Sequence, residues 1–167
     1  VGGGMAIGVI CGKKEIMQYA DTTGKKKSER SYVGGGTFSA NPASMVAGFS
    51  TLTELKNSKN KIYSKINELG QFTRKELGKV LGEKVIITGK GSLFMTHFVK
   101  NGITEITNST QAAKCNSLKL QKYHFKMIAE NGIFFLPGKL GAISTAHSKK
   151  DIKEMVIASE DFVRSQE

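Results

Sequence analysis

The sequence has few of the residues that mark secreted or membrane proteins. It contains no tryptophan, two prolines and two cysteines in 167 residues. Cys11 and Cys115 lie far apart, so a disulfide framework is not the basis of the fold and a reducing compartment fits. No apolar run approaches the roughly 20 residues of a membrane-spanning helix, and no signal-peptide pattern opens the chain. We therefore predict a cytoplasmic protein without a membrane span.

Arginine is also scarce, although the chain is strongly basic. The formal net charge is +11, and nearly all of the positive charge is lysine. The only arginines are Arg30, Arg74 and Arg164, whereas arginine dominates bidentate recognition of phosphates and bases. The sequence lacks a stripe of basic and aromatic residues of the kind that binds single strands. We therefore interpret the lysines as solvated surface and predict no nucleic-acid partner.

Glycine, in contrast, is abundant with 19 copies, and the most informative cluster is GGGTFSANP at residues 34–42. Glycine allows a backbone to approach a ligand closely. An exposed backbone N–H beside a threonine hydroxyl offers two donors to a phosphate oxygen, and Asn41 with Pro42 is typical of a helix start. Gly36 and Thr37 are therefore candidate phosphate-binding residues. A structural turn before a helix is the alternative interpretation.

Two other glycine-rich stretches do not match known phosphate loops. Gly24 is followed by three lysines and a serine, as at the end of a Walker motif, but Tyr19 occupies the position of the first glycine. The opening VGGGMAI has Ile7 where a dinucleotide-binding fingerprint needs its third glycine. Neither pattern predicts a nucleotide site.

The three histidines give no sign of a metal site. Their spacing to the cysteines matches no common metal-ligand pattern, so no metal is predicted. We expect His97 to be packed within a strand, His124 to lie on the surface of a helix, and His147 to precede a helix cap. A cysteine–histidine nucleophile pair has no support beyond composition.

Hydrophobic periodicity predicts a mixture of helices and short strands. The expected strands are residues 5–11, 85–88, 93–99, 133–136 and 142–144. The expected helices are residues 13–20, 42–57, 59–81, 110–130 and 148–165, with a mobile loop at 21–31. This mixture is typical of a small α+β domain after a segment that is poor material for a domain of its own. We place the boundary after Gly82.

Six blocks of the sequence form a wider pattern. They are VGGGMAIG at 1–8, CGKKEIM at 11–17, the 34–42 cluster, GSLF at 91–94, NGIFFLP at 131–137 and AHSKKDI at 146–152. In this order and spacing they resemble the C-terminal part of class III pyridoxal-phosphate (PLP) aminotransferases, and in particular the glutamate-1-semialdehyde aminomutases and their aminotransferase relatives. The resemblance covers nearly the whole chain.

The resemblance implies an α/β fold, a fragment of a fold type I PLP-transferase. Residues 1–82 would be the tail of the PLP-binding large domain with an interdomain helix. Residues 83–167 would be the small C-terminal α+β domain. PLP is the implied cofactor, and Gly36 with Thr37 would bind the phosphate of the cofactor held by the neighbouring subunit.

The family's Schiff-base lysine lies a few residues before the block that the opening glycines resemble, and this chain starts at Val1. Lys13 and Lys14 lie on the other side of that block and read as a solvated turn, so no catalytic residue is assigned. We therefore expect a chain that is inactive alone. Its expected partner is a second copy in a homodimer, or an N-terminal half in a complex.

Gly141 marks a departure from the aminomutase pattern. It aligns with a glutamate that helps aminomutases to recognise their substrate, so its lack of a carboxylate argues against that substrate. Gly141 is thus the predicted substrate-binding position of an aminotransferase that acts on an amino acid and a carbonyl compound. Two alternatives stay open: a glutamate-1-semialdehyde 2,1-aminomutase of tetrapyrrole biosynthesis, and a non-catalytic assembly module paired with an N-terminal half.

Overall fold

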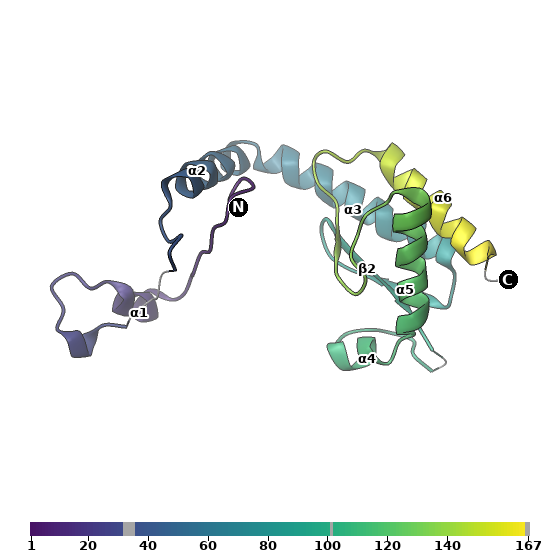
Figure 1. Cartoon of the computed structure of the whole chain (residues 1–167), viewed down its shortest axis with the longest axis horizontal. Coiled ribbons are helices and arrows are strands. Elements are labelled where there is room, and N and C mark those ends of the chain that lie inside the picture. The colour runs from purple at the N-terminus through teal and green to yellow at the C-terminus, as the bar shows by residue number, and fades with distance from the viewer. Residues whose placement is uncertain (32–35, 101, 166–167) are drawn as a thin grey trace. The chain divides into compact units, whose positions relative to one another are not determined.

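The computed structural model describes residues 1–31, 36–100 and 102–165 (Figure 1). The chain divides into two compact units, unit 1 at Val1–Lys59 and unit 2 at Asn60–Glu167. The predicted domain boundary after residue 82 refers to a complete parent enzyme and stays a prediction. In the described part of the chain, no helix has both the length and the apolar character to cross a bilayer.

Unit 1 is built around one long helix, α2 (Pro42–Asn57), as the sequence predicts for residues 42–57. The Asn41 side chain accepts a hydrogen bond from the Ser44 N–H at 3.2 Å, and Pro42 occupies the first helical turn. Both features satisfy or remove N–H groups that a helix start leaves unpaired. The predicted helix at 13–20 is confirmed as two short pieces, α1 (Lys14–Met17) and η1 (Gln18–Ala20), and a further turn, η2 (Lys27–Glu29), follows.

The opening glycines pack directly against α2. The Met5 N–H donates to the Gly2 carbonyl at 3.0 Å, which closes a turn. Gly3, within that turn, has a positive φ of 59°. A Cβ at Gly3 would lie 2.8 Å from the Thr51 hydroxyl and 3.0 Å from the Ala47 carbonyl. Glycine is needed here because both the left-handed backbone and the close approach exclude a side chain.

The predicted strand at residues 5–11 is wrong. This stretch forms no regular element, and Val9 and Ile10 are exposed. A strand is stable only when a neighbouring strand pairs with its backbone, and the described residues of unit 1 provide none. The apolar run has side chains that are suited to burial, but in the structure Val9 and Ile10 are exposed to solvent.

Unit 2 contains the three-stranded sheet and most of the helices. Its elements, in chain order, are α3 (Lys59–Leu81, which starts at the last residue of unit 1), β1 (Val85–Thr88), β2 (Leu93–Phe98), α4 (Ser109–Ala113), α5 (Ser117–Phe125), the π-helical turn η3 (Lys126–Glu130), β3 (Gly141–Ala142) and α6 (Lys149–Arg164). The sheet order is β1-β2-β3, and both pairings are antiparallel. The predicted helices at 59–81 and 148–165 and the predicted hairpin are confirmed.

Helix α3 holds the turn of the hairpin. The guanidinium of Arg74 donates to the carbonyls of Gly91 and Leu93 at 2.8 and 2.7 Å. Gly70, one turn earlier in α3, is buried, and a Cβ there would lie only 2.1 Å from the Gly91 carbonyl oxygen. Gly89, with a φ of 141°, completes the turn. Helix and hairpin thus approach each other backbone to backbone.

The core of unit 2 lies between the sheet and the helices, and aromatic rings fill its centre. Phe98, Tyr123 and Phe162 meet edge to face, with ring centroids 5.3–5.8 Å apart. The Tyr123 hydroxyl lies 2.8 Å from the Ser159 hydroxyl, so the one polar atom of the ring has a partner. Burial raises the pKa of Tyr123 to about 12, which keeps the phenol neutral.

Two of the predicted elements of unit 2 differ in the structure. The expected helix at 110–130 is divided, because Asn108 and Asn116 each cap a separate helix start by accepting a hydrogen bond at 3.0 Å from a backbone N–H three residues on. The expected strand at 133–136 is not a strand. The Ile133 N–H instead donates to the carbonyl of Met127, within η3, at 2.8 Å. Of the strand predicted at 142–144, only Ala142 lies in a strand: β3 comprises Gly141 and Ala142, which pair with Phe94 and Leu93.

Candidate functional site

The predicted phosphate loop forms two successive turns that lead into α2. The Ser39 N–H donates to the Gly36 carbonyl at 2.9 Å, and the Asn41 N–H donates to the Phe38 carbonyl at 3.1 Å. Ala40 has a φ of 55°, in the left-handed region that non-glycine residues rarely occupy. Such strain is concentrated at functional sites. Gly34 and Gly35, the first glycines of the predicted loop, lie outside the described residues.

The donors of this loop face solvent. Gly36 and Thr37 are both exposed, and a Cβ built at Gly36 would meet no atom within 4 Å. Among the residues that the structure describes, none forms a hydrogen bond with the Thr37 hydroxyl. Within the described part of the chain, an anion could therefore reach the Thr37 hydroxyl without displacing a partner.

The loop borders a groove of about 590 Å³. The groove is lined by residues 6–10, Gly36, residues 38–40 and Met45. Ser39 adds a second exposed hydroxyl at this groove. Ser39 was not among the predicted site residues; its place in the same loop, two residues after Thr37, is the signal that could have found it. Thr37 does not line the groove, but its neighbours Gly36 and Phe38 do.

Gly141, the predicted substrate position, lies in unit 2 against an aromatic ring. It is buried, and a Cβ built on it would lie 2.3 Å from the tip of the Phe94 ring. Phe94 is itself buried and packs on Phe135 at a centroid distance of 6.0 Å. Position 141 can therefore carry a side chain only if Phe94 moves. Sequence reasoning missed Phe94, because nothing local to residue 94 indicates that its ring covers residue 141.

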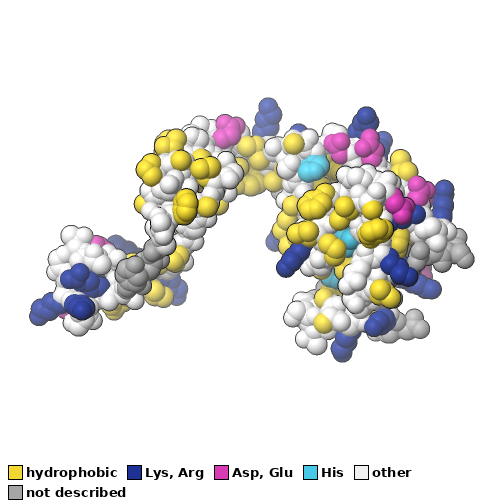
Figure 2. Space-filling view, viewed as in Figure 1, with side chains coloured by type: hydrophobic (Ala, Val, Ile, Leu, Met, Phe, Trp, Pro, Cys, Tyr) yellow, Lys and Arg dark blue, Asp and Glu magenta, His cyan; other side chains and the backbone are white. Residues whose placement is uncertain are grey.

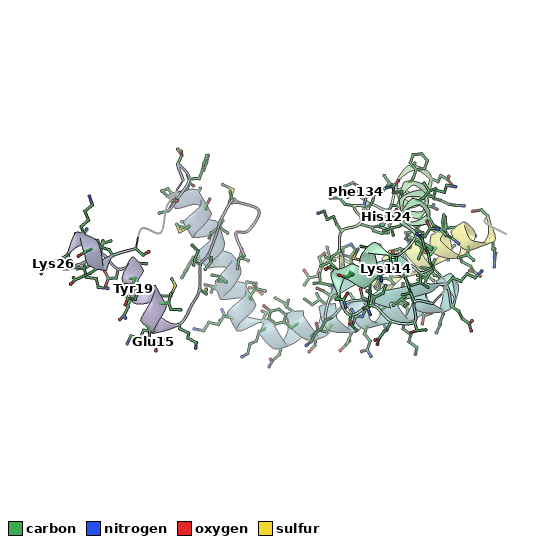
Figure 3. The ribbon with its side chains drawn as sticks, turned by 90° about the horizontal axis from the view of Figure 1, so that it is seen from below. Glu15, Tyr19, Lys26, Lys114, His124 and Phe134 are labelled. Carbon is green, nitrogen blue, oxygen red and sulfur yellow. The ribbon has the colours of Figure 1, made fainter. Side chains whose placement is uncertain are left out.

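His124 lies in the interior, so its predicted surface position is wrong. Only 2% of the residue is exposed, its Nδ1 lies 2.8 Å from the Leu120 carbonyl, and its ring meets Phe135 at 4.5 Å. The segment after η3 covers this face of α5, because Phe135 packs against the core there. Its neighbour Phe134 is exposed (Figure 3). Because that segment is not a regular element, helix periodicity alone did not reveal the cover.

The other two histidines are held by local contacts. His97 is buried as predicted, with Nε2 2.9 Å from the Thr88 hydroxyl, and burial lowers its pKa. His147 precedes the cap of α6, where its Nδ1 accepts a hydrogen bond from the Ser144 N–H at 2.9 Å. Within the described ranges, no three potential ligands are grouped as a metal ion would require.

Acidification is expected to destabilise unit 2 through His124. Burial lowers the pKa of His124 below its ordinary value, so the unfolded chain takes up a proton before the folded chain does. The stabilisation is complete above the ordinary histidine pKa of about 6.5 and is lost as the pH falls below it. Urea unfolding at pH 8, 7, 6 and 5 should show this loss.

Two variants separate His124 from the other titrating groups. His124→Leu should reduce the dependence of the free energy of unfolding on pH, leaving the part that His97 contributes. Gln121→Leu, at an exposed position of the same helix, removes no titratable group and should leave the dependence unchanged. An unchanged dependence in His124→Leu would show that another group is responsible.

Comparisons with known proteins extend over almost the entire chain. No protein-family model matches it. It is 30% identical to glutamate-1-semialdehyde 2,1-aminomutase 2 of Lachnoclostridium phytofermentans, over 99% of this chain and 38% of that protein. It is 31% identical to the glutamate-1-semialdehyde 2,1-aminomutase of Sulfolobus acidocaldarius, over 91% of this chain and 34% of that protein. The chain thus spans little more than a third of the length of these relatives.

Solved structures give the same assignment for the fold. An omega-transaminase from Sphaerobacter thermophilus superposes with a TM-score of 0.76 at 27% identity, over 98% of this chain and 36% of that one. A transaminase with PLP bound superposes with a TM-score of 0.68 at 27% identity, over 92% of this chain and 34% of that one. A beta-phenylalanine aminotransferase from Variovorax paradoxus, 24% identical over 92% of this chain and 34% of that one with a TM-score of 0.73, supports the fold alone.

Sequence and structure therefore agree with the resemblance carried by the glycine-rich blocks. The relatives are PLP-dependent enzymes, and the match covers one part of each of them. The chain is therefore similar in sequence and in fold to the class III, PLP-dependent aminotransferases and aminomutases, and the match fits their C-terminal portion.

Proposed function

We propose that this chain is part of a PLP-dependent enzyme that transfers an amino group between an amino acid and a carbonyl compound. The observation that carries the proposal is the exposed pair of donors at Gly36 and Thr37, next to a groove in unit 1. PLP supplies the electron sink of amino-transfer chemistry when it is bound. The residues of this chain would bind and orient it.

The loop is suited to a phosphate group. Thr37 and Ser39 supply hydroxyl donors, and Gly36 leaves the backbone open to close approach because no side chain covers it. Neutral donors of this type hold phosphates in many glycine-rich loops. Hydrogen bonds to such a charged group are stronger than those to a neutral one. We infer that Thr37 Oγ and the adjacent N–H groups donate to the cofactor phosphate.

The described residues of the groove do not include a lysine that could hold the cofactor covalently. Lys13 and Lys14 are exposed residues at the start of α1. We propose that residues other than these 167 provide this lysine and that the chain has no amino-transfer activity by itself. A non-catalytic assembly module that completes a partner's site is the alternative that this observation favours.

Exposed apolar side chains on unit 1 support such a partner. Figure 2 shows hydrophobic side chains gathered over α2. The exposed large apolar residues of this helix include Val46, Phe49 and Leu52. Exposed apolar side chains that gather on one surface are characteristic of interaction sites. We propose that unit 1 associates with a second copy of the chain or with an N-terminal half, in the cytoplasm.

The pairing of Gly141 and Phe94 favours an aminotransferase over an aminomutase. Residue 141 is glycine, so the chain lacks the carboxylate expected of an aminomutase at this position. A carboxylate side chain there would also collide with the Phe94 ring. Glutamate-1-semialdehyde 2,1-aminomutase is the second candidate, because the two curated relatives described above carry that name.

A substrate comparison tests the proposal. The chain would be assayed with PLP and a partner that supplies the cofactor-binding lysine. Amino transfer from a β- or ω-amino acid to a 2-oxo acid is the expected result, with no isomerisation of glutamate 1-semialdehyde. Isomerisation without amino transfer would establish the aminomutase instead. Stable assembly without either activity would establish the assembly module.

A further inference from the structure

A second groove lies in unit 2, away from Gly141 and independent of the proposed amino-transfer reaction. It runs between α5 and α6 and has a volume of about 470 Å³. These two helices are neighbours in Figure 1. The residues that line it include Leu118, Lys122, Phe125, Lys126, Glu130 and Phe162.

Two large apolar side chains stand at the surface of this groove. Leu118 is 62% exposed and Phe125 is 69% exposed, whereas Phe162, at the floor, is only 2% exposed. Leu118, Lys122 and Phe125 are spaced i, i+4 and i+7, so they lie on one face of α5. Exposed Leu and Phe side chains at this spacing form a seam of the kind that a second helix covers.

Lysines dominate the charge along the same seam. Lys122 is exposed, and none of the described residues forms an ion pair with it. Lys126 spans the end of the groove, where its ammonium donates to the Asp161 carbonyl at 3.3 Å and lies 3.9 Å from the Glu130 carboxylate. Among the described residues that line the groove, Glu130 is the only acidic one. Its charge is opposed by two lysines on a chain of net charge +11.

We propose that the α5–α6 groove binds an amphipathic helix of a partner protein whose apolar face is flanked by acidic residues. The apolar face would cover Leu118 and Phe125, and a flanking carboxylate would pair with Lys122. Charge complementarity selects the acidic partner, because it speeds encounter and disfavours basic helices.

The length of the seam fits a helix. From residue 118 to residue 125 the helix rises about 10.5 Å, at 1.5 Å per residue, which is two turns. A helix that lies in a groove between two others presents anchors at i, i+3 or i+4, and i+7. A nucleic acid would leave Leu118 without an apolar partner, and the described residues that line the groove include no arginine to hold its phosphates.

The test uses the full chain and a defined probe. The probe is a fluorescein-labelled 18-residue peptide with leucines at helical spacing and glutamates on both flanks of the leucine face. Fluorescence anisotropy should give a dissociation constant in the micromolar range, of about 1–100 μM, as for a small interface. A peptide with every glutamate replaced by lysine, and one with every leucine replaced by serine, should each bind at least about tenfold more weakly.

Surface variants connect the binding to the groove. Phe125→Ser and Lys122→Glu should each weaken the binding of the acidic peptide by about tenfold, which is the usual effect of losing one important contact. Lys153→Glu is the matched control, because Lys153 is an exposed lysine of α6 outside the groove, and no ion pair to it is found among the described residues. It should bind the peptide as the unmodified chain does. Lys122→Glu tests the proposal even if Phe125→Ser perturbs folding.

Three results would overturn the proposal. The first is equal binding of the acidic and the lysine-substituted peptides. The second is equal loss in Lys122→Glu and Lys153→Glu, which would indicate a general charge effect. The third is stronger binding of single-stranded DNA or of vesicles of anionic lipid than of the acidic peptide, with the same dependence on Phe125. That would assign the groove to another class of partner.

Discussion

Gly70→Ala is expected to destabilise unit 2 by about 1–3 kcal/mol, as overpacking of a filled interior does. The added methyl group would lie 2.1 Å from the Gly91 carbonyl oxygen and 2.9 Å from the Ser92 Cα, and both are backbone atoms. These atoms cannot turn aside as a flexible side chain does. The hairpin turn must therefore move away from α3, and the two hydrogen bonds of Arg74 to that turn would be lost or stretched.

Gly78→Ala is the control, because it makes the same change in the same helix. A Cβ at Gly78 meets no atom within 4 Å, so this variant should gain about 0.5–1 kcal/mol from the helix preference of alanine over glycine. Urea unfolding of the two variants, followed by circular dichroism, should thus separate them by about 1.5–4 kcal/mol. Equal midpoints would mean that α3 and the hairpin are not in backbone contact.

The parts of the fold that could be predicted from the sequence depend on local signals. Helix α2 begins where Asn41 and Pro42 supply a cap and a first turn, and α6 begins where Ser148 and Asp151 form a capping box. The hairpin follows from two apolar runs around two glycines. In each case the deciding interactions connect residues close in sequence, so a short window contains the relevant physics.

The features that escaped prediction depend on contacts between distant residues. His124 is buried because Phe135 packs on its ring, and no pattern around residue 124 shows that. The apolar run at residues 5–11 has the composition of a buried strand, but a strand needs a partner and composition supplies none. Phe94 over Gly141 is likewise a contact between residues 47 positions apart.

For the candidate site, the sequence identified the loop but not its surroundings. The donors of Gly36 and Thr37, together with the resemblance to the PLP-dependent family, predict these two residues as the phosphate site. Their role in binding the phosphate stays a proposal. Ser39 and the groove beside the loop emerged only from the structure, because a groove is defined by segments that the sequence keeps apart.

Thr37→Val is expected to weaken PLP binding by roughly ten- to a hundredfold in an assembly that contains this chain and the cofactor-binding lysine. Valine keeps the shape of threonine but cannot donate a hydrogen bond. A hydrogen bond to a charged phosphate contributes about 1.5–3 kcal/mol. The backbone donors of the loop remain, so binding should persist. Turnover at saturating PLP should change much less, because the phosphate does not take part in bond making.

The most direct test of the phosphate-loop proposal is a PLP titration of the apoenzyme assembly with unmodified chain, Thr37→Val and Thr53→Val. Thr53 is an exposed threonine of α2 outside the loop and the groove, so its variant controls for the loss of a hydroxyl alone. We expect a dissociation constant raised roughly ten- to a hundredfold in Thr37→Val and unchanged in Thr53→Val. Equal dissociation constants for all three would contradict the proposal and leave Gly36 and Thr37 as a structural turn before α2.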